Sequence, residues 1–360
     1  MEKDSGLSYT PPRSRWPGCL ARIISGLLVI VILLAVIVMS LIEKYIKMPG
    51  ENYAGPRAEL ESTADRELAQ TLRHDVTMLS DVLGERNLTN APDRLAAAEA
   101  WISQELVQSQ GDSRKVTRLT YTVGDHEVAN LEATRPGLGK PEEIVIIGAH
   151  YDSAPGTAGA NDNASGVAAL LALARLTHGM KFERTLRFVA FVNEEPPYFQ
   201  SGEMGSQVYA LGCKRADENI VGMLCLETVG YYSEAPGSQK YPPLVDKFYP
   251  NIGNFIAFVG NDDSRDLVRQ CVGEFRKHAK IRSEGIAAPP GVEGIDLSDH
   301  ASFWEFGYPA LMITDTAPFR YPYYHTAQDL PEHLDFGQMT QVVKGLVPVI
   351  ECLAESHAEE

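Results

Sequence analysis

Histidine and acidic side chains stand at the ends of apolar runs that have the length and composition of buried strands. The runs and the residues after them are IVIIGA with His150, LRFVAFV-Asn with Glu194 and Glu195, VGMLCLE with Glu227 as its last residue, and ALMITD with His325 in the following loop. Active sites of open α/β sheets collect at the carboxyl ends of the strands. We therefore expect these side chains to converge at one edge of a sheet.

The residue types at this edge are those that bind zinc when cysteine ligands are absent. Asp162, within GANDNASG, opens the helix expected after the first run and joins the set. Two histidines and three carboxylates suit a pair of ions, because a carboxylate can bridge two metals with its two oxygens and an imidazole cannot. Two adjacent ions polarise a carbonyl and lower the pKa of a bound water. In the pair Glu194-Glu195, one carboxylate can ligate metal while the other accepts the proton of that water.

Composition argues against two other classes of site. The chain has five cysteines and no CxxC pair, so a thiolate zinc site is not expected. Cys19 stands apart at the edge of an apolar run, and the four later cysteines are either buried thiols or one or two disulfides. The formal net charge of −16 argues against nucleic acid as a partner, because phosphate binding needs clustered lysine and arginine. We interpret the excess of acid as a solvated surface.

The elements that must position these residues alternate between strand and helix from residue 143 onwards. Helices are expected over residues 164–176, 205–211, 264–278 and 336–354, between the apolar runs. This alternation predicts an α/β fold, a three-layer sandwich with helices on both faces of a mixed, mainly parallel central sheet. Upstream, helical spacing covers residues 59–83 and 92–107, and VTRLTYTV and HEVANLEA form a hairpin about Gly124-Asp125.

Residues 23–42 form an uncharged, almost wholly apolar run. A helix of this length spans roughly 30 Å, the thickness of a hydrocarbon core. A cleaved signal peptide and a buried core helix are the alternatives, but the run is longer than a usual signal segment and has no polar face. We expect a transmembrane anchor, with residues 1–22 as a short cytoplasmic tail, 43–57 as a linker and 58–360 as an exported domain. A slight excess of basic residues before the run favours this orientation.

Five stretches, taken in order, resemble the zinc-dependent exopeptidase family that includes aminopeptidase Y, glutamate carboxypeptidase and glutaminyl cyclase. They are GAHYDS, GANDNASGVAALLALAR, the NEE after a hydrophobic strand, SDHASFWEFGYPALMITD and YYHTAQDLPEHLD. They cover about residues 143–336, with weaker similarity back to about residue 90. The chain thus resembles a bacterial-type, membrane-anchored member of this family, and the resemblance implies two co-catalytic zinc ions.

The resemblance also implies which residues ligate the metal. His150 ligates one zinc ion, and Asp162 bridges both. Glu195 and His325 ligate the second ion. Glu227 stands where the family has an aspartate or glutamate ligand. A glutamate side chain is one methylene longer than that of aspartate.

The remaining roles implied by the resemblance belong to side chains around the metals. Glu194 is the general base, and Asp152 orients the histidine two residues before it. Tyr324 matches a position whose hydroxyl can stabilise an oxyanion. Asp299 and His300 are expected to support the site without ligating. The chain departs from the family after Glu-Glu, where Pro-Pro-Tyr-Phe-Gln-Ser-Gly-Glu-Met precedes a retained Gly-Ser, and this loop is expected to line or roof the substrate cleft.

The family resemblance points to removal of N-terminal residues from peptides by a water that two zinc ions activate. A carboxypeptidase is the first alternative, for which Arg320 and Lys240 are the candidate cations for a terminal carboxylate. A glutaminyl cyclase works with one zinc ion and an altered ligand set. A receptor-like protein is expected to have lost ligands, and all five are present here.

Overall fold

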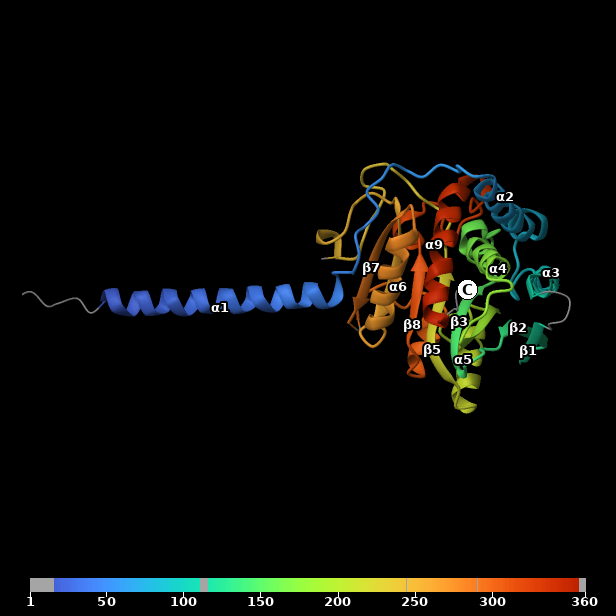
Figure 1. Cartoon of the computed structure of the whole chain (residues 1–360), viewed down its shortest axis with the longest axis horizontal. Coiled ribbons are helices and arrows are strands. Elements are labelled where there is room, and N and C mark those ends of the chain that lie inside the picture. Colours follow the sequence, from blue (N-terminus) through green and yellow to red (C-terminus); the bar gives the residue numbers. More distant parts are fainter. Residues whose placement is uncertain (1–15, 111–115, 244, 290, 356–360) are drawn as a thin grey trace, which may run out of the picture. The chain divides into compact units, whose positions relative to one another are not determined.

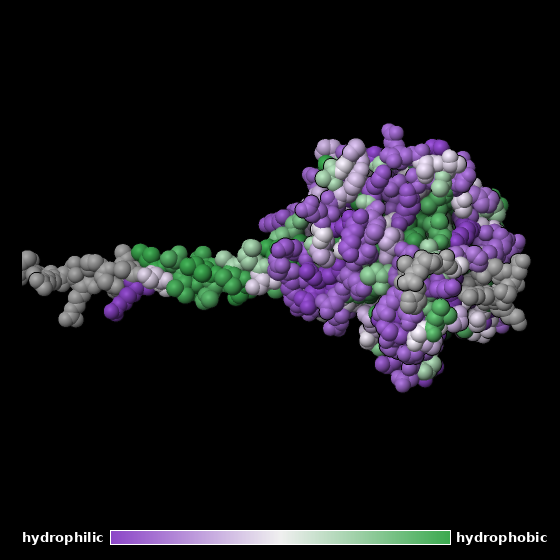
Figure 2. All heavy atoms as spheres, in the orientation of Figure 1, coloured by the Kyte–Doolittle hydropathy of each residue, from purple (hydrophilic) through white to green (hydrophobic). Residues whose placement is uncertain are grey.

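The computed structural model describes residues 16–110, 116–243, 245–289 and 291–355, in two compact units, Met1–Lys44 and Tyr45–Glu360. The first unit holds most of helix α1 (Trp16–Tyr45). Within α1, Arg22–Tyr45 is the one helical stretch in the described residues that is long and apolar enough to cross a membrane. Its large apolar side chains are exposed and form a continuous hydrophobic surface (Figure 2). Such a helix fits both a membrane span and a secretion signal.

The second unit is built on a sheet of eight strands in the order β1-β2-β4-β3-β5-β8-β6-β7 (Figure 1). The strands are β1 (Val116–Val123), β2 (His126–Arg135), β3 (Lys140–His150), β4 (Arg184–Phe191), β5 (Asn219–Glu227), β6 (Phe255–Asn261), β7 (Arg282–Ala288) and β8 (Ala310–Thr314). Strands β4, β3, β5 and β8 are parallel, and β6 and β7 are parallel to each other. The β1–β2, β2–β4 and β6–β8 pairs are antiparallel. The mixed, mainly parallel sheet expected from the sequence is confirmed.

Helices cover both faces of this sheet, as expected. They are α2 (Thr63–Thr77), α3 (Pro92–Gln110), α4 (Gly166–Leu176), α5 (Gly205–Arg215), α6 (Arg265–His278), α7 (His300–Glu305), α8 (Ala317–Arg320) and α9 (Phe336–Ala354). Alternate residues of β3 serve the two layers, because side chains of a strand point to opposite faces in turn. Val145 and Ile147 join the core under α2, α3, α4, α6 and α9, whereas Ile144 and Ile146 join the core under α5 and α7.

Two elements differ from the expectation in instructive ways. Strand β7, RSEGIAA, was not predicted, because it is short of the branched apolar residues that mark a strand. Its Gly285 is required by packing, since a Cβ there would lie 2.7 Å from the Cγ of Met48. The helix expected from residue 59 begins at Thr63. The Ser62 hydroxyl accepts a hydrogen bond from the N–H of Asp65 and so caps the N-terminus of this helix.

The core under α6 offers a test of the packing. Phe275 of α6 is fully buried and lies edge-on to Phe258 of β6, with ring centroids 5.1 Å apart. We expect Phe275→Ala to lower the free energy of unfolding by about 3–5 kcal/mol, because the cavity adds to the lost transfer energy. Phe248, which is 45% exposed, provides the control. Denaturant unfolding of both variants measures the difference, and equal losses would contradict the packing described.

Candidate metal centre

The carboxyl ends of neighbouring parallel strands bring the acidic and histidine residues together. His150 is the last residue of β3, and Glu227 is the last residue of the adjacent strand β5. Glu194 and Glu195 follow β4, on the other side of β3. Asp162 precedes α4, and His325 lies in the loop between α8 and α9.

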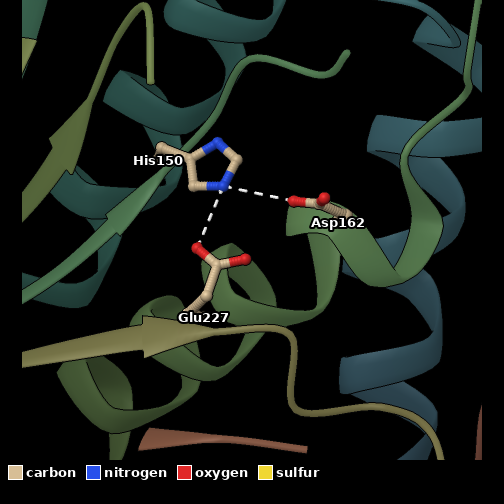
Figure 3. Close-up of side chains that lie close together, drawn as sticks. All are labelled: His150, Asp162 and Glu227. Atoms are coloured by element: carbon tan, nitrogen blue, oxygen red, sulfur yellow. Dashed lines mark ion pairs between the residues drawn. The ribbon is translucent and has the colours of Figure 1, made fainter. Parts of the chain in front are cut away.

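The first group of side chains consists of His150, Asp162 and Glu227 (Figure 3). Nε2 of His150 lies 3.2 Å from Oδ1 of Asp162 and 3.2 Å from Oε2 of Glu227. All three residues are buried. Three ligand-type atoms therefore converge on one point away from solvent.

The second group consists of Asp162, Glu195 and His325. Nε2 of His325 lies 3.0 Å from Oδ2 of Asp162 and 3.3 Å from Oε2 of Glu195. The two groups share Asp162, whose Oδ1 faces the first imidazole and whose Oδ2 faces the second. The carboxylate thus lies between the groups, as a bridging ligand would.

The chemistry of these atoms fits two metal ions. Nε2 of His150, Oδ1 of Asp162 and Oε1 of Glu195 are buried without a hydrogen-bond partner among the described residues. Buried polar atoms are rarely left without partners, and a bound ion would satisfy all three of these atoms. The donors are imidazole nitrogens and carboxylate oxygens, which zinc accepts readily. The cysteines whose side chains are described are free thiols and belong to neither group.

The electrostatics of the two groups agree with this fit. Burial raises the pKa of Glu195 to about 7, and the charge of Asp162 adds to the effect. Burial also raises the pKa of Glu227. Burial lowers the pKa of His325, but hydrogen bonds to Asp162 and Glu195 outweigh it and bring that pKa to about 10. Clustered carboxylates shielded from water favour a bound cation, which stabilises their charged form.

Asp152 connects the first histidine with the glutamate pair. Its Oδ1 lies 3.4 Å from Nδ1 of His150, on the ring edge opposite the ligand-type nitrogen. Its two oxygens also accept the main-chain N–H groups of Glu194 and Glu195, each at 3.1 Å. The Glu194 carboxylate lies beside the first group, with Oε2 3.9 Å from Nε2 of His150, and burial raises its pKa well above the usual range.

Tyr324, Asp299 and His300 lie around the two groups. The Tyr324 ring stacks on His325 with centroids 3.9 Å apart, and burial raises the pKa of its hydroxyl. Asp299 is buried, which raises its pKa to about 7. Nε2 of His300 donates to the carbonyl of Ile295 at 2.6 Å, and burial lowers its pKa to about 4. Neither Asp299 nor His300 belongs to the ligand groups.

Residues that the sequence did not single out hold the side chains and main chain of the two groups in place. Asp329 accepts the N–H groups of Asn161 at 2.8 Å and Asp162 at 3.1 Å, so it fixes the main chain at the shared carboxylate. The hydroxyl of Ser298 donates to Oε2 of Glu227 at 2.6 Å. Asp329 and Ser298 both stand within the motif stretches quoted above. The position of Asp329, four residues after His325, was an available signal, whereas Ser298 lies far in sequence from every residue of the two groups.

An apolar pocket opens beside the two groups. Glu227 and Tyr324 line its inner end, and it extends over the faces of β8, β6 and β7. We call it the side pocket. The inserted loop after Glu195 lies elsewhere around the site, where Nε2 of Gln200 reaches the carbonyl of Asp296 at 3.5 Å. Among the described residues, the loop contributes no side chain to the side pocket.

Known proteins share both sequence and fold with this chain. A model of Peptidase family M28 matches residues 130–350. The chain is 37% identical over 300 residues to uncharacterized protein YfbL of Escherichia coli (strain K12), covering 81% of this chain and 90% of that protein. It is 27% identical over 311 residues to leucine aminopeptidase 1 of Trichophyton equinum, covering 79% and 74%.

Solved structures confirm the fold. BSAP, a zinc aminopeptidase from Bacillus subtilis, aligns with a TM-score of 0.58 at 14% identity, covering 81% of this chain and 95% of that one. Fimbriiglobus ruber glutaminyl cyclase aligns with a TM-score of 0.57 at 19% identity, covering 85% and 99%. One fold therefore carries both activities, so the chemistry must be argued from the site.

Proposed function

The chain belongs to peptidase family M28, and on that premise we propose that it is a di-zinc aminopeptidase that removes N-terminal residues from peptides. The observation that carries the proposal is the sharing of buried Asp162 by the two ligand groups. His150, Asp162 and Glu227 would hold one ion, and Asp162, Glu195 and His325 the other. When bound, the pair would polarise the scissile carbonyl and lower the pKa of an attacking water.

The side chains around the metals would move the protons. Glu194, buried and outside both ligand groups, would accept a proton from the water and pass it to the leaving amine. Asp152 faces Nδ1 of His150 and thereby favours the proton on that nitrogen, which leaves Nε2 free to ligate. The hydroxyl of Tyr324 would donate a hydrogen bond to the developing oxyanion.

The alternatives receive less support from the site. A carboxypeptidase needs a free cation for the terminal carboxylate of its substrate. Arg320 is buried and donates to Oε1 of Gln239 at 2.7 Å and to the carbonyl of Phe255 at 2.8 Å, whereas Lys240 is exposed and outside the side pocket. A cyclase that works with one zinc ion would not need the second ligand group, Asp162, Glu195 and His325.

We also propose that the apolar helix anchors the enzyme, with its N-terminus cytoplasmic and its catalytic domain exported. The uncharged stretch over residues 23–42 and the basic residues before it support this. Cell fractionation distinguishes an anchor from a cleaved signal. A full-length chain that stays in the membrane fraction after a carbonate wash is anchored. Release of a shortened chain would contradict anchoring and indicate a cleaved signal.

The proposed activity is tested with the zinc-loaded full chain in detergent. We expect hydrolysis of amino-acid anilides with a free amine, no hydrolysis of their N-acetyl forms, and loss of activity with a chelator that zinc restores. Cleavage of N-blocked peptides at a free carboxyl end would indicate a carboxypeptidase instead. Loss of ammonia from N-terminal glutamine without hydrolysis would indicate a cyclase.

A further inference from the structure

The side pocket has walls suited to a long apolar stem. Residues of the neighbouring strands β8, β6 and β7 and of three connecting segments line it, among them Phe255, Ala257, Ile286, Ile295 and Met312. Strands β8 and β6 lie between β5, which carries Glu227, and the edge strand β7. With about 4.8 Å between strands, the pocket extends roughly 14 Å sideways from the metal-side end. Short side chains would leave its far part unfilled.

The charged residues of this pocket are all acidic. Glu227, Glu284 and Glu293 line it, and the described lining contains no lysine or arginine. Glu293 is exposed and Glu227 belongs to the proposed metal site, so Glu284 is the one that faces the far part. Burial raises the pKa of Glu284, and the charges of Arg276 and Arg282 oppose that shift without cancelling it.

The carboxylate of Glu284 is held in place, but one oxygen is left for a ligand. Oε1 accepts from Nδ2 of Asn52 at 3.0 Å, and Oδ1 of Asn52 accepts the N–H of Ser283 at 2.8 Å. Oε2 has no hydrogen bond from a described residue. Its nearest cation is Nη2 of Arg276 at 4.0 Å, a nitrogen that already donates to the carbonyl of Ser283 at 2.8 Å.

Two tyrosine rings complete the far end. Tyr241 and Tyr249 line the pocket, with ring centroids 5.9 Å apart and an angle of 28° between the ring planes. The hydroxyl of Tyr249 donates to the carbonyl of Gly285, the residue after the carboxylate. Aromatic faces beside a carboxylate are a favourable environment for an ammonium or guanidinium group.

We propose that the side pocket receives the side chain of the substrate's N-terminal residue and selects lysine and arginine, with Glu284 as the specificity-determining residue. Asn52, only seven residues after α1 ends, is the positioning residue for that carboxylate. This inference rests on the proposed aminopeptidase function. It extends that function to a substrate class, N-termini with a long apolar stem and a cationic head.

The test compares kcat/KM for lysyl, arginyl, norleucyl and glutamyl anilides with the zinc-loaded full chain. Norleucine matches the lysine stem without its charge. We expect lysine and arginine to exceed norleucine by about tenfold or more, the range for a charge-assisted hydrogen bond in a partly buried site. Glu284→Gln, of equal size, should lower the lysyl and arginyl values and so abolish this ratio. Asn52→Ala should reduce the ratio in part, and Glu51→Gln, at an exposed neighbour, should not change it.

A second measurement does not depend on turnover. Titration calorimetry with Glu194→Gln protein should give a lower Kd for argininamide than for norleucinamide, and a second change, Glu284→Gln, should remove the difference. Hydrolysis with an apolar preference, or a Glu284→Gln variant that slows all substrates equally, would overturn the inference and leave the aminopeptidase intact. Absence of hydrolysis of every free-amine substrate would overturn the proposed function, and this inference with it.

Discussion

Glu194→Gln is expected to lower kcat by about 10²- to 10⁴-fold while the zinc content stays at two per chain. The carboxylate lies beside the ligand groups but in neither of them, so its loss removes a proton acceptor and no ligand. Glutamine has the same shape and cannot accept a proton from water. KM should change little, because the amide still fills the same buried site.

Steady-state kinetics and metal analysis of the same preparation check this result. Glu203→Gln provides a matched control on the loop that follows, since Glu203 is exposed. Loss of one zinc ion from the Glu194 variant would make this residue a ligand. A variant with full activity would exclude it as the base.

Asp162→Asn is expected to have the largest effect, a loss of activity of about 10³-fold or more together with loss of metal. Oδ1 and Oδ2 face different imidazoles, and an amide has only one oxygen to offer. At least one ion should therefore bind weakly, and two-metal stabilisation worth several kcal/mol disappears.

Zinc content after dialysis is the direct readout for this variant. We expect one ion or fewer per chain for Asp162→Asn and two for Asp125→Asn, a change at an exposed turn. Circular dichroism and thermal melting show whether the variant remains folded. Two tightly held ions in folded Asp162→Asn protein would contradict a bridging role.

His150, Glu195 and Glu227 could be found from the sequence by a general physical rule. Apolar runs predict strands, and a polar residue at the carboxyl end of such a run is expected at the edge where active sites form. The structure then pairs His150 with Glu227, because it makes β3 and β5 parallel neighbours, a strand order that the sequence did not predict. His325 is less tightly placed by this rule, because it lies in a loop after its apolar run, and the family resemblance was needed to assign it to the second group.

The far end of the side pocket was not predictable from the sequence. Strand β7 has a polar, glycine-containing sequence. It is stabilised by pairing with β6 and by contact of Gly285 with Met48. Residues 43–57 read as a linker, yet Met48 is buried and the guanidinium of Arg276 donates to the carbonyl of Gly50 at 3.2 Å. The local sequence of residues 43–57 does not predict that this segment packs against β7, an edge strand more than 200 residues later in the chain.

The central claim is that two metal ions share Asp162. Crystals of the zinc-loaded protein, measured on both sides of the zinc absorption edge, test it most directly. We expect two anomalous peaks that both contact the Asp162 carboxylate, one beside His150 and Glu227 and the other beside Glu195 and His325. A single peak at full zinc occupancy, or a second peak away from His325, would contradict the claim.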